Sequence, residues 1–189
     1  MHFFAAVPPL PHTTSFLPFF QNPFFPFFPF NMDAFMAANS FEEQKIEGDG
    51  NCFYRSIAAA ILGDDDQHAE IRKVAMDYLS AKIDEYSIYF ESKNKFKRSV
   101  AANRRSGVWN TEICDLVPGA TAEALKIKLT VHSWTCGKVV SETYAPEGAG
   151  CELNLLLVCG HYSLLVPAAA AAMPAHSAPP ACGPAMCTA

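Results

Sequence analysis

Two short segments, more than 100 residues apart, carry the side chains that could do covalent chemistry. The first reads Gly-Asp-Gly-Asn-Cys and ends at Cys52, and the second reads Cys-Gly-His-Tyr-Ser and centres on His161. A thiol attacks a carbonyl as the thiolate, and a histidine can take the thiol proton and later protonate the leaving group. The pair therefore predicts acyl transfer, with Cys52 as the nucleophile and His161 as the general base.

The element that must position Cys52 is a helix. Apolar residues recur at helical spacing over 57–62, which predicts a helix that begins at Cys52 or the residue before it and ends at Gly63. A cysteine in the first turn faces unpaired backbone N–H groups and the positive end of the helix dipole, which favour a thiolate. Gly48 and Gly50 let the preceding loop turn sharply and let its N–H groups point at a developing oxyanion. A cysteine at a helix start is more often a small buried residue, so the loop alone does not decide.

The other predicted elements divide into a helical first half and a stranded second half. Helices are predicted over 67–83, 109–116 and 121–125, whereas 84–105 is polar and helical at best in pieces. Pro118 and Gly119 are expected to close the helix over 109–116. The apolar period then changes to two over 127–132, which predicts a strand with one face in water, and 138–144 could be a second strand. A continuous apolar run over 153–158 is typical of a central buried strand, and it resumes over 163–166 after Gly160. Helices followed by an antiparallel or mixed sheet indicate an α+β fold.

The composition divides the 189 residues into three parts. Residues 1–44 form a leader rich in Phe and Pro, 45–167 a folded domain, and 168–189 a tail rich in Ala and Pro, and both ends are predicted to be disordered. Prolines interrupt the apolar leader, so it is not expected to span a membrane, although it could touch a membrane surface or a partner. Met32 would be a sensible alternative start.

Charge and cysteine content limit the other classes of function. Fourteen Lys and Arg against sixteen Asp and Glu from Lys45 onward leave that part near neutral, so nucleic acid is not expected as a partner. Seven cysteines without a CxxC pair favour reduced thiols in a cytoplasmic or nuclear protein. No cofactor or metal is expected, since Cys136, His132, Cys159 and His161 fit no familiar zinc pattern. A monomer is expected.

Four ordered blocks resemble the ovarian-tumour (OTU) family of deubiquitinating cysteine proteases. They read GDGNCFYRSIAAAILG, HAEIRKVAMDYL, GVWNTEICDL and NLLLVCGHYSLLV, and they cover about residues 45–166. The Asp-Gly-Asn-Cys block is the most specific of the four. The resemblance implies a papain-like OTU fold, in which helices pack on a small mixed or antiparallel sheet. It also implies that the substrates are proteins conjugated to ubiquitin or to a ubiquitin-like modifier.

The resemblance implies roles for individual residues as well. Cys52 is the nucleophile and His161 the base, and Asp49 matches an acid that is commonly grouped with the catalytic residues. Asp49 could orient the loop or stabilise the imidazolium, and by itself it could be a turn-forming residue. The backbone N–H groups of Gly50, Asn51 and Cys52 would form the oxyanion hole.

Ser163 is a departure from the family pattern. Many members place Asp or Asn two residues after the histidine to orient its ring, whereas the Ser163 hydroxyl carries no charge. Either Asp49 or another acid takes that role, or the site works largely as a Cys–His dyad.

Two other functions stay open beside the isopeptidase. One is a catalytically weak module that binds ubiquitin without cutting it, and the other is a polyprotein-processing protease of a virus or mobile element. The acidic run 64–66 could attract the basic tail of ubiquitin, although an acidic turn between helices is the simpler interpretation. The basic residues of 93–105 are expected to form a solvated face.

Overall fold

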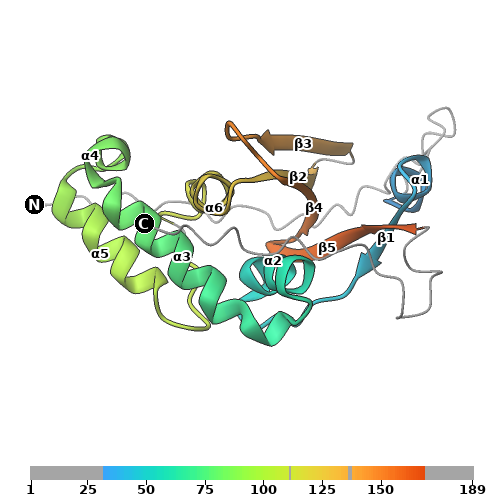
Figure 1. The fold of residues 1–189 in the computed structure, drawn as a ribbon, viewed down its shortest axis with the longest axis horizontal. Coiled ribbons are helices and arrows are strands. Elements are labelled where there is room, and N and C mark those ends of the chain that lie inside the picture. Colours follow the sequence, from blue (N-terminus) through green and yellow to red (C-terminus); the bar gives the residue numbers. More distant parts are fainter. Residues whose placement is uncertain (1–31, 111, 136–137, 169–189) are drawn as a thin grey trace, which may run out of the picture.

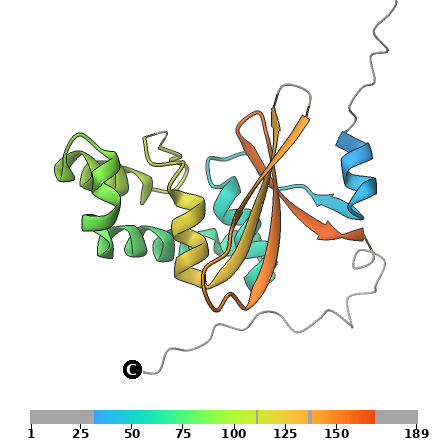
Figure 2. The same ribbon diagram turned by 90° about the horizontal axis from the view of Figure 1, so that it is seen from above.

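The sheet divides the molecule into a thick helical side and a thin side. A computed structural model describes residues 32–110, 112–135 and 138–168. The helices are α1 (Met32–Ala38), α2 (Cys52–Leu62), α3 (His68–Ala81), α4 (Ile83–Tyr86), α5 (Lys93–Asn103) and α6 (Val117–Leu125). The strands are β1 (Phe41–Gln44), β2 (Ile127–Thr135), β3 (Lys138–Tyr144), β4 (Cys151–Val158) and β5 (His161–Pro167). Short 3₁₀ turns cover Asp65–Gln67 and Ser87–Tyr89. Helices α2 to α6 lie on one side of the sheet and α1 on the other (Figures 1 and 2).

The five strands form one mixed sheet in the order β1-β5-β4-β2-β3. Strands β2 and β4 run parallel, and the other three neighbouring pairs are antiparallel. Helices packed on a small mixed sheet confirm the predicted α+β class. The strands over 138–144 and 153–158 are confirmed as well.

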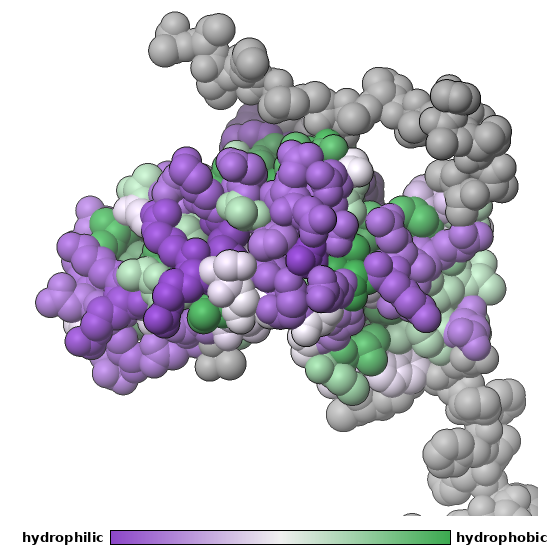
Figure 3. Space-filling view, turned by 90° about the horizontal axis from the view of Figure 1, so that it is seen from below, coloured by the Kyte–Doolittle hydropathy of each residue, from purple (hydrophilic) through white to green (hydrophobic). Residues whose placement is uncertain are grey.

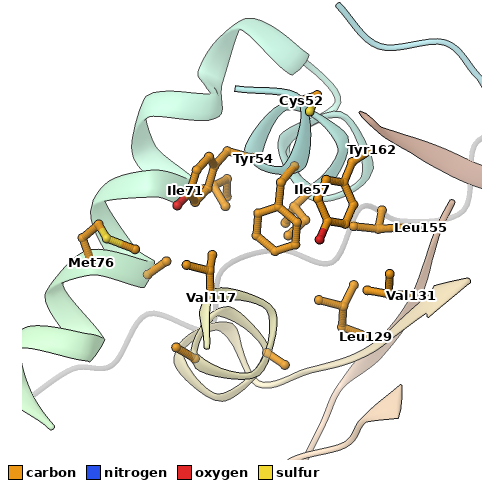
Figure 4. Packing of buried hydrophobic residues seen from close by; sticks show 14 of the residues in the cluster. Cys52, Tyr54, Ile57, Ile71, Met76, Val117, Leu129, Val131, Leu155 and Tyr162 are labelled. Atoms are coloured by element: carbon orange, nitrogen blue, oxygen red, sulfur yellow. The ribbon is translucent and has the colours of Figure 1, made fainter. Parts of the chain in front are cut away.

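The main core lies between α2, α3, α6 and the inner face of the sheet. Phe53 and Ile57 of α2 are fully buried, as are Leu129 of β2 and Leu155 of β4. Figure 4 shows these layers meeting, with Cys52 at the margin of the cluster. Each buried side chain of this size contributes about 1.5–3 kcal/mol to stability. The helix that carries Cys52 is therefore anchored to the strand that carries His161, since α2 packs on β5.

The outer face of β2 is covered, so the expectation of one wet face is wrong. His132 is only 8% exposed, because the rings of Phe35 and Phe41 lie 5.1 and 5.8 Å from its ring. Its two ring nitrogens are hydrogen-bonded to Ser141 Oγ and Asn154 Oδ1. The cover comes from α1 and β1, two elements within the predicted leader.

The leader and tail boundaries change accordingly. Strand β1 pairs with β5 along its whole length, so disorder is the wrong prediction for residues 32–44. The rest of the predicted leader and residues 169–189 of the predicted tail lie outside the described residues.

Two helical predictions also change. Residues 93–103 form one helix, since the Ser92 hydroxyl accepts a hydrogen bond from the Lys95 amide and Phe96 is buried. Residues 112–116 form turns, and α6 begins where the helix over 109–116 was expected to end. Pro118 lies in the first turn of α6, where its missing N–H costs nothing.

The surface drawn in Figure 3 is mostly hydrophilic, with scattered apolar patches among its coloured residues. The large apolar side chains that stay exposed are Ile88, Tyr89 and Val140. Within the described ranges, every helix is too short or too polar to cross a membrane.

Candidate active site

Cys52 is the first residue of α2, as the apolar spacing predicted. The side chain of the preceding Asn51 does not cap the helix, so the first-turn N–H groups are left for another acceptor. The residue is 9% exposed, at the edge of the core. An anion that develops at this thiol or at a bound carbonyl therefore meets the positive end of an 11-residue helix.

Asp49 organises the loop before Cys52. Its Oδ1 accepts a hydrogen bond from the Asn51 amide at 2.8 Å, and its Oδ2 accepts from Asn51 Nδ2 at 2.6 Å and from Arg55 Nη2 at 3.0 Å. Partial burial alone would raise the pKa of the Asp49 carboxyl, but the hydrogen bonds from Arg55 and Asn51 outweigh it and hold that pKa well below its usual range. Asp49 is thus a fixed anion that acts on the loop.

Arg72 holds the same loop from the other side. The residue is 3% exposed, and its Nη2 donates to the Gly50 carbonyl at 3.0 Å and to Asn51 Oδ1 at 2.8 Å. Its Nη1 donates to the carbonyls of Asn103 and Val108 at 2.6 and 2.7 Å. The guanidinium therefore ties the nucleophile loop to the end of α5 and the segment after it, a connection between residues far apart in sequence.

The peptide between Gly50 and Asn51 is consequently fixed at both ends. Its carbonyl accepts from Arg72, and its N–H donates to Asp49. The Asn51 N–H is therefore committed, which corrects its predicted place in the oxyanion hole. The N–H groups of Gly50 and Cys52 donate to no acceptor within the described residues, so these two donors remain for an oxyanion.

Gly50 must be a glycine here. Its φ is +77°, and a Cβ at this position would lie 2.2 Å from the Gly107 carbonyl oxygen. The close approach lets Asn51 Oδ1 accept a hydrogen bond from the Gly107 amide at 2.8 Å.

His161 is the first residue of β5, directly after a two-residue turn. Cys159 and Gly160 both have positive φ, +50° and +78°, the signature of a type I′ hairpin turn between Val158 and His161. The imidazole lies over the nucleophile loop, since a Cβ built on Gly48 would be 3.6 Å from His161 Nδ1. The structure thus brings the segment that contains His161 to the loop that precedes Cys52.

Aromatic packing joins the residues that follow the nucleophile and the base. The Phe53 and Tyr162 rings are 5.1 Å apart, centre to centre, in an edge-to-face arrangement. Trp109 lies 5.4 Å from Phe53 and 5.6 Å from Tyr162. Such pairs add about 0.5–1.5 kcal/mol each beyond their buried area, so they stabilise the approach of α2 to β5.

Ser163 lies on the same face of β5 as His161, because side chains alternate along a strand. It is 2% exposed and pairs with Leu156 across the sheet. Within the described residues, the His161 ring has no hydrogen-bond partner, either from Ser163 or from Asp49. Packing and strand register alone orient the base here.

The acidic run and the basic segment have structural partners. Arg55 Nη1 lies 2.8 Å from Asp66 Oδ1 and 3.4 Å from Asp65 Oδ2, so these two acids hold α2 to the start of α3. In the basic segment, Lys95 pairs with Glu91 and Arg104 with Asp77. The simpler interpretation of each charge run is supported.

Neither Arg55 nor Arg72 was predicted from the sequence to have a role in the site. Both lie on helices; the partners of Arg55 are acids within 11 residues, whereas Arg72 also binds carbonyls more than 30 residues away. The described residues bring together no group of three His, Cys, Asp or Glu side chains that could hold a metal ion. Cys136, one of the four residues considered for zinc, lies outside them.

The family model for OTU-like cysteine proteases matches residues 47–158. The chain belongs to this family. The matched range includes Cys52 and Arg72 and ends three residues before His161. The match therefore covers the loop and helix that carry Cys52, and β5, which carries His161, follows the matched range.

Curated relatives carry the same domain. A deubiquitinating enzyme of Arabidopsis thaliana, "OVARIAN TUMOR DOMAIN-containing deubiquitinating enzyme 10", is 30% identical over 91 residues, which are 48% of this chain and 24% of that protein. Human "OTU domain-containing protein 1" is 26% identical over 95 residues, which are 50% of this chain and 18% of that protein. The matches span a quarter or less of each relative.

Solved structures share the fold at low identity. The OTUD1 OTU domain has a TM-score of 0.60 at 21% identity and covers 71% of this chain and 91% of that one. The Hazara virus OTU bound to ubiquitin has a TM-score of 0.55 at 17% identity, covering 67% and 80%. The viral OTU domain protease from Dera Ghazi Khan virus has a TM-score of 0.53 at 22% identity, covering 66% and 80%.

Proposed function

We propose that this chain is a cysteine isopeptidase that hydrolyses the bond after the C-terminal glycine of ubiquitin or a ubiquitin-like modifier. The observation that carries the proposal is the state of the nucleophile loop. Asp49 and Arg72 fix its Gly50–Asn51 peptide, and the Cys52 thiol and two N–H groups are left at the start of a helix. This arrangement suits attack on a carbonyl that becomes an oxyanion.

The reaction follows from these groups. His161 takes the Cys52 proton, and the sulfur attacks the glycine carbonyl, whose oxygen becomes an anion beside the Gly50 and Cys52 N–H groups. The C–N bond breaks as His161 gives its proton to the leaving amine, and a thioester remains on Cys52. Water, deprotonated by His161, then hydrolyses the thioester and restores the thiol. In this proposal Asp49 positions the loop, and the chemistry is that of a Cys–His dyad.

A fluorogenic ubiquitin substrate and a panel of diubiquitins test the function. Wild-type protein should turn over at least one of them, whereas Cys52→Ala and His161→Ala should lose turnover by at least a hundredfold. Asp49→Ala should cost less than either, since its effect passes through the loop. Cys151→Ala, which removes another partly buried thiol, should retain activity. Turnover that survives Cys52→Ala would contradict the proposal.

A second candidate is a module that binds ubiquitin without cutting it. The observation that favours it is the His161 ring, which no hydrogen bond orients within the described residues. Binding of ubiquitin to the wild-type protein, with no turnover of any substrate in the panel, would establish this alternative. The unusual composition of the two terminal segments favours the viral or mobile-element alternative, and these segments lie outside the described residues except for 32–44 and Ala168.

A further inference from the structure

Strand β3 forms one edge of the sheet and is paired on one side only. Within the described residues its strand neighbour is β2, with which all seven of its residues pair. Figure 1 shows β3 as the outermost strand, at the opposite edge of the sheet from β1. In an antiparallel pair, every second residue turns its N–H and C=O away from the partner strand. A seven-residue edge is therefore a template for one more strand.

The side chains of β3 divide between the two faces of the sheet. Ser141 points to the outer face, where its hydroxyl is hydrogen-bonded to His132 of β2. Because side chains alternate along a strand, Lys138, Val140 and Glu142 point to the inner face. All three are exposed, and the exposed fraction of Val140 is 50%. This edge thus presents a cation, an apolar side chain and an anion, in that order, on one face.

The two charges of this edge lack a partner of opposite charge. Lys138 and Glu142 are four residues apart, which is about 13 Å along a strand and too far for an ion pair between them. The Glu142 carboxylate accepts a hydrogen bond from the neutral Tyr144 hydroxyl. Within the described residues, neither Lys138 nor Glu142 forms an ion pair. Both charges are therefore available to a strand that lies alongside β3.

A second copy of β3 would supply the matching charges. Two copies related by a two-fold axis perpendicular to the sheet run antiparallel and keep each side chain on its own face. When Val140 lies opposite Val140 of the second copy, Lys138 of each copy lies opposite Glu142 of the other. The Cβ atoms of directly opposite residues are about 4.5–5.5 Å apart, so an ion pair can form on each side of the apolar contact.

Other symmetric registers of the same strand do not match its charges. Centring the pair on Ser141 places Val140 opposite Glu142, and centring it on Val139 places Lys138 opposite Val140. Neither register brings opposite charges together. Centring it on Glu142 places two carboxylates directly opposite each other, which is destabilising. The charges therefore favour the register centred on Val140.

Strand β1, at the other edge of the sheet, lacks this complementarity. It has four residues, and the two in the middle are Glu42 and Glu43. A symmetric pairing centred on either residue would place that carboxylate opposite its own copy, and like charges directly opposite are destabilising. The charges of β1 therefore oppose self-pairing, whereas those of β3 favour it.

We propose that β3 is a dimerisation surface, through which two copies of this chain join their sheets edge to edge in the register centred on Val140. This dimer takes the place of the expected monomer. One pair of seven-residue strands is a small contact, and interfaces below about 1,000 Å² are weak or transient, so the dimer forms as the protein concentration rises. Strands β2 and β4 separate β3 from β5, which carries His161, so the dimer is independent of the proposed function.

Sedimentation velocity of the full-length chain over a series of concentrations tests this surface. Wild-type protein should shift from monomer to dimer as the concentration rises. Lys138→Glu brings carboxylates together at both ion pairs and Glu142→Lys brings ammonium groups together, so each variant should weaken self-association at least about tenfold. Glu147→Lys makes the same charge change as Glu142→Lys outside β3 and should dimerise as wild type does.

An equimolar mixture of the Lys138→Glu and Glu142→Lys variants tests the register. In the mixed pair, the two acids of one copy lie opposite the two lysines of the other, so association should return to the wild-type level. Thermal unfolding checks that both variants are folded. Where one is not, Val140→Lys replaces it and should be monomeric, because two ammonium groups would meet at the centre of the pair. Wild-type protein that stays monomeric, a dimer that the charge reversals leave intact, or a mixture of folded variants that stays monomeric would overturn the proposal.

Discussion

The two halves of the site are held in place by different forces. The nucleophile loop is fixed by directional hydrogen bonds to two charged groups, Asp49 on one side and Arg72 on the other. His161 is placed by a tight turn, by strand register and by the packing of its neighbour Tyr162 on Phe53. One half is defined by polar contacts and the other by the hydrophobic core.

The difference predicts how each half responds to damage. Hydrogen bonds to charged groups are worth about 1.5–3 kcal/mol each and fix the directions of N–H groups, so losing one should displace the oxyanion donors. Packing fixes the position of a strand but leaves a side chain free to rotate about its own bonds. Substitutions in the nucleophile loop should therefore cause large losses of activity, whereas substitutions around His161 should cause small changes.

The largest effect is expected from Gly50→Ala. The new Cβ would meet the Gly107 carbonyl at 2.2 Å in a backbone conformation with φ of +77°, so the loop must move. We expect at least a hundredfold loss of kcat/KM on a ubiquitin substrate. Gly63→Ala is the matched control, because Gly63 has φ of +73° but no atom within 4 Å of the new Cβ. That variant should lose about 1 kcal/mol of stability and keep its activity. Equal losses in the two variants would mean that strain alone, without the Gly107 contact, matters.

Arg72→Met should follow. Removing this buried cation leaves the carbonyls of Gly50, Asn103 and Val108 without their donor, and we expect a loss of about 3 kcal/mol in unfolding free energy, with a slower kcat. Arg104→Met is the control, since Arg104 forms an exposed ion pair with Asp77 that should be worth less than about 1 kcal/mol. Urea unfolding of both variants measures the contrast. An Arg72→Met variant as stable as Arg104→Met would refute the charged clamp.

Ser163 variants should change activity only by a few fold. If packing alone orients His161, Ser163→Ala should lower kcat by less than about twofold. Ser163→Asn adds an amide two residues after the base and should raise kcat, provided that thermal unfolding shows that the buried position accepts it. A tenfold loss in Ser163→Ala would show that the hydroxyl already orients the ring, and the contrast between the halves would disappear.

The smallest effect concerns His68, behind the nucleophile loop. Burial lowers the pKa of His68 below its ordinary 6.5, and the Arg55 charge adds to this, so the folded state favours the neutral ring. The stability tied to His68 is complete above the unfolded pKa near 6.5 and is lost as the pH falls toward the lower folded pKa. His68→Gln should therefore lose less stability than wild type between pH 7.5 and 5.5 in urea unfolding. Parallel curves would mean that His68 is not the group responsible.

The sequence predicted the features that depend on neighbours along the chain. Apolar spacing predicted a helix start at Cys52, alternation predicted β2, and a continuous apolar run predicted β4. It could not place Arg72, because two of its partners are the backbone carbonyls of Asn103, at the end of α5, and Val108, both more than 30 residues away. The prediction that Pro118 ends a helix was wrong, because proline is common both after a helix and in its first turn. Only the packing of α6 decides between these two positions.

The outer face of β2 is a second feature that the residue pattern along the chain could not predict. Thr130 and His132 alternate with apolar residues as an exposed face would, and yet both are buried. The cover comes from Phe35 and Phe41, which composition had assigned to a disordered leader. Local pattern reports how a strand alternates, but not what packs against it.

The central claim is that the Cys52 sulfur forms a covalent bond to ubiquitin. The most direct measurement is to incubate the protein with ubiquitin that carries a C-terminal electrophile and to map the modified residue by mass spectrometry. The account predicts a single ubiquitin adduct on Cys52, none on the other six cysteines, and no adduct in Cys52→Ala. An adduct on another cysteine, or folded wild-type protein that stays unmodified, would contradict it.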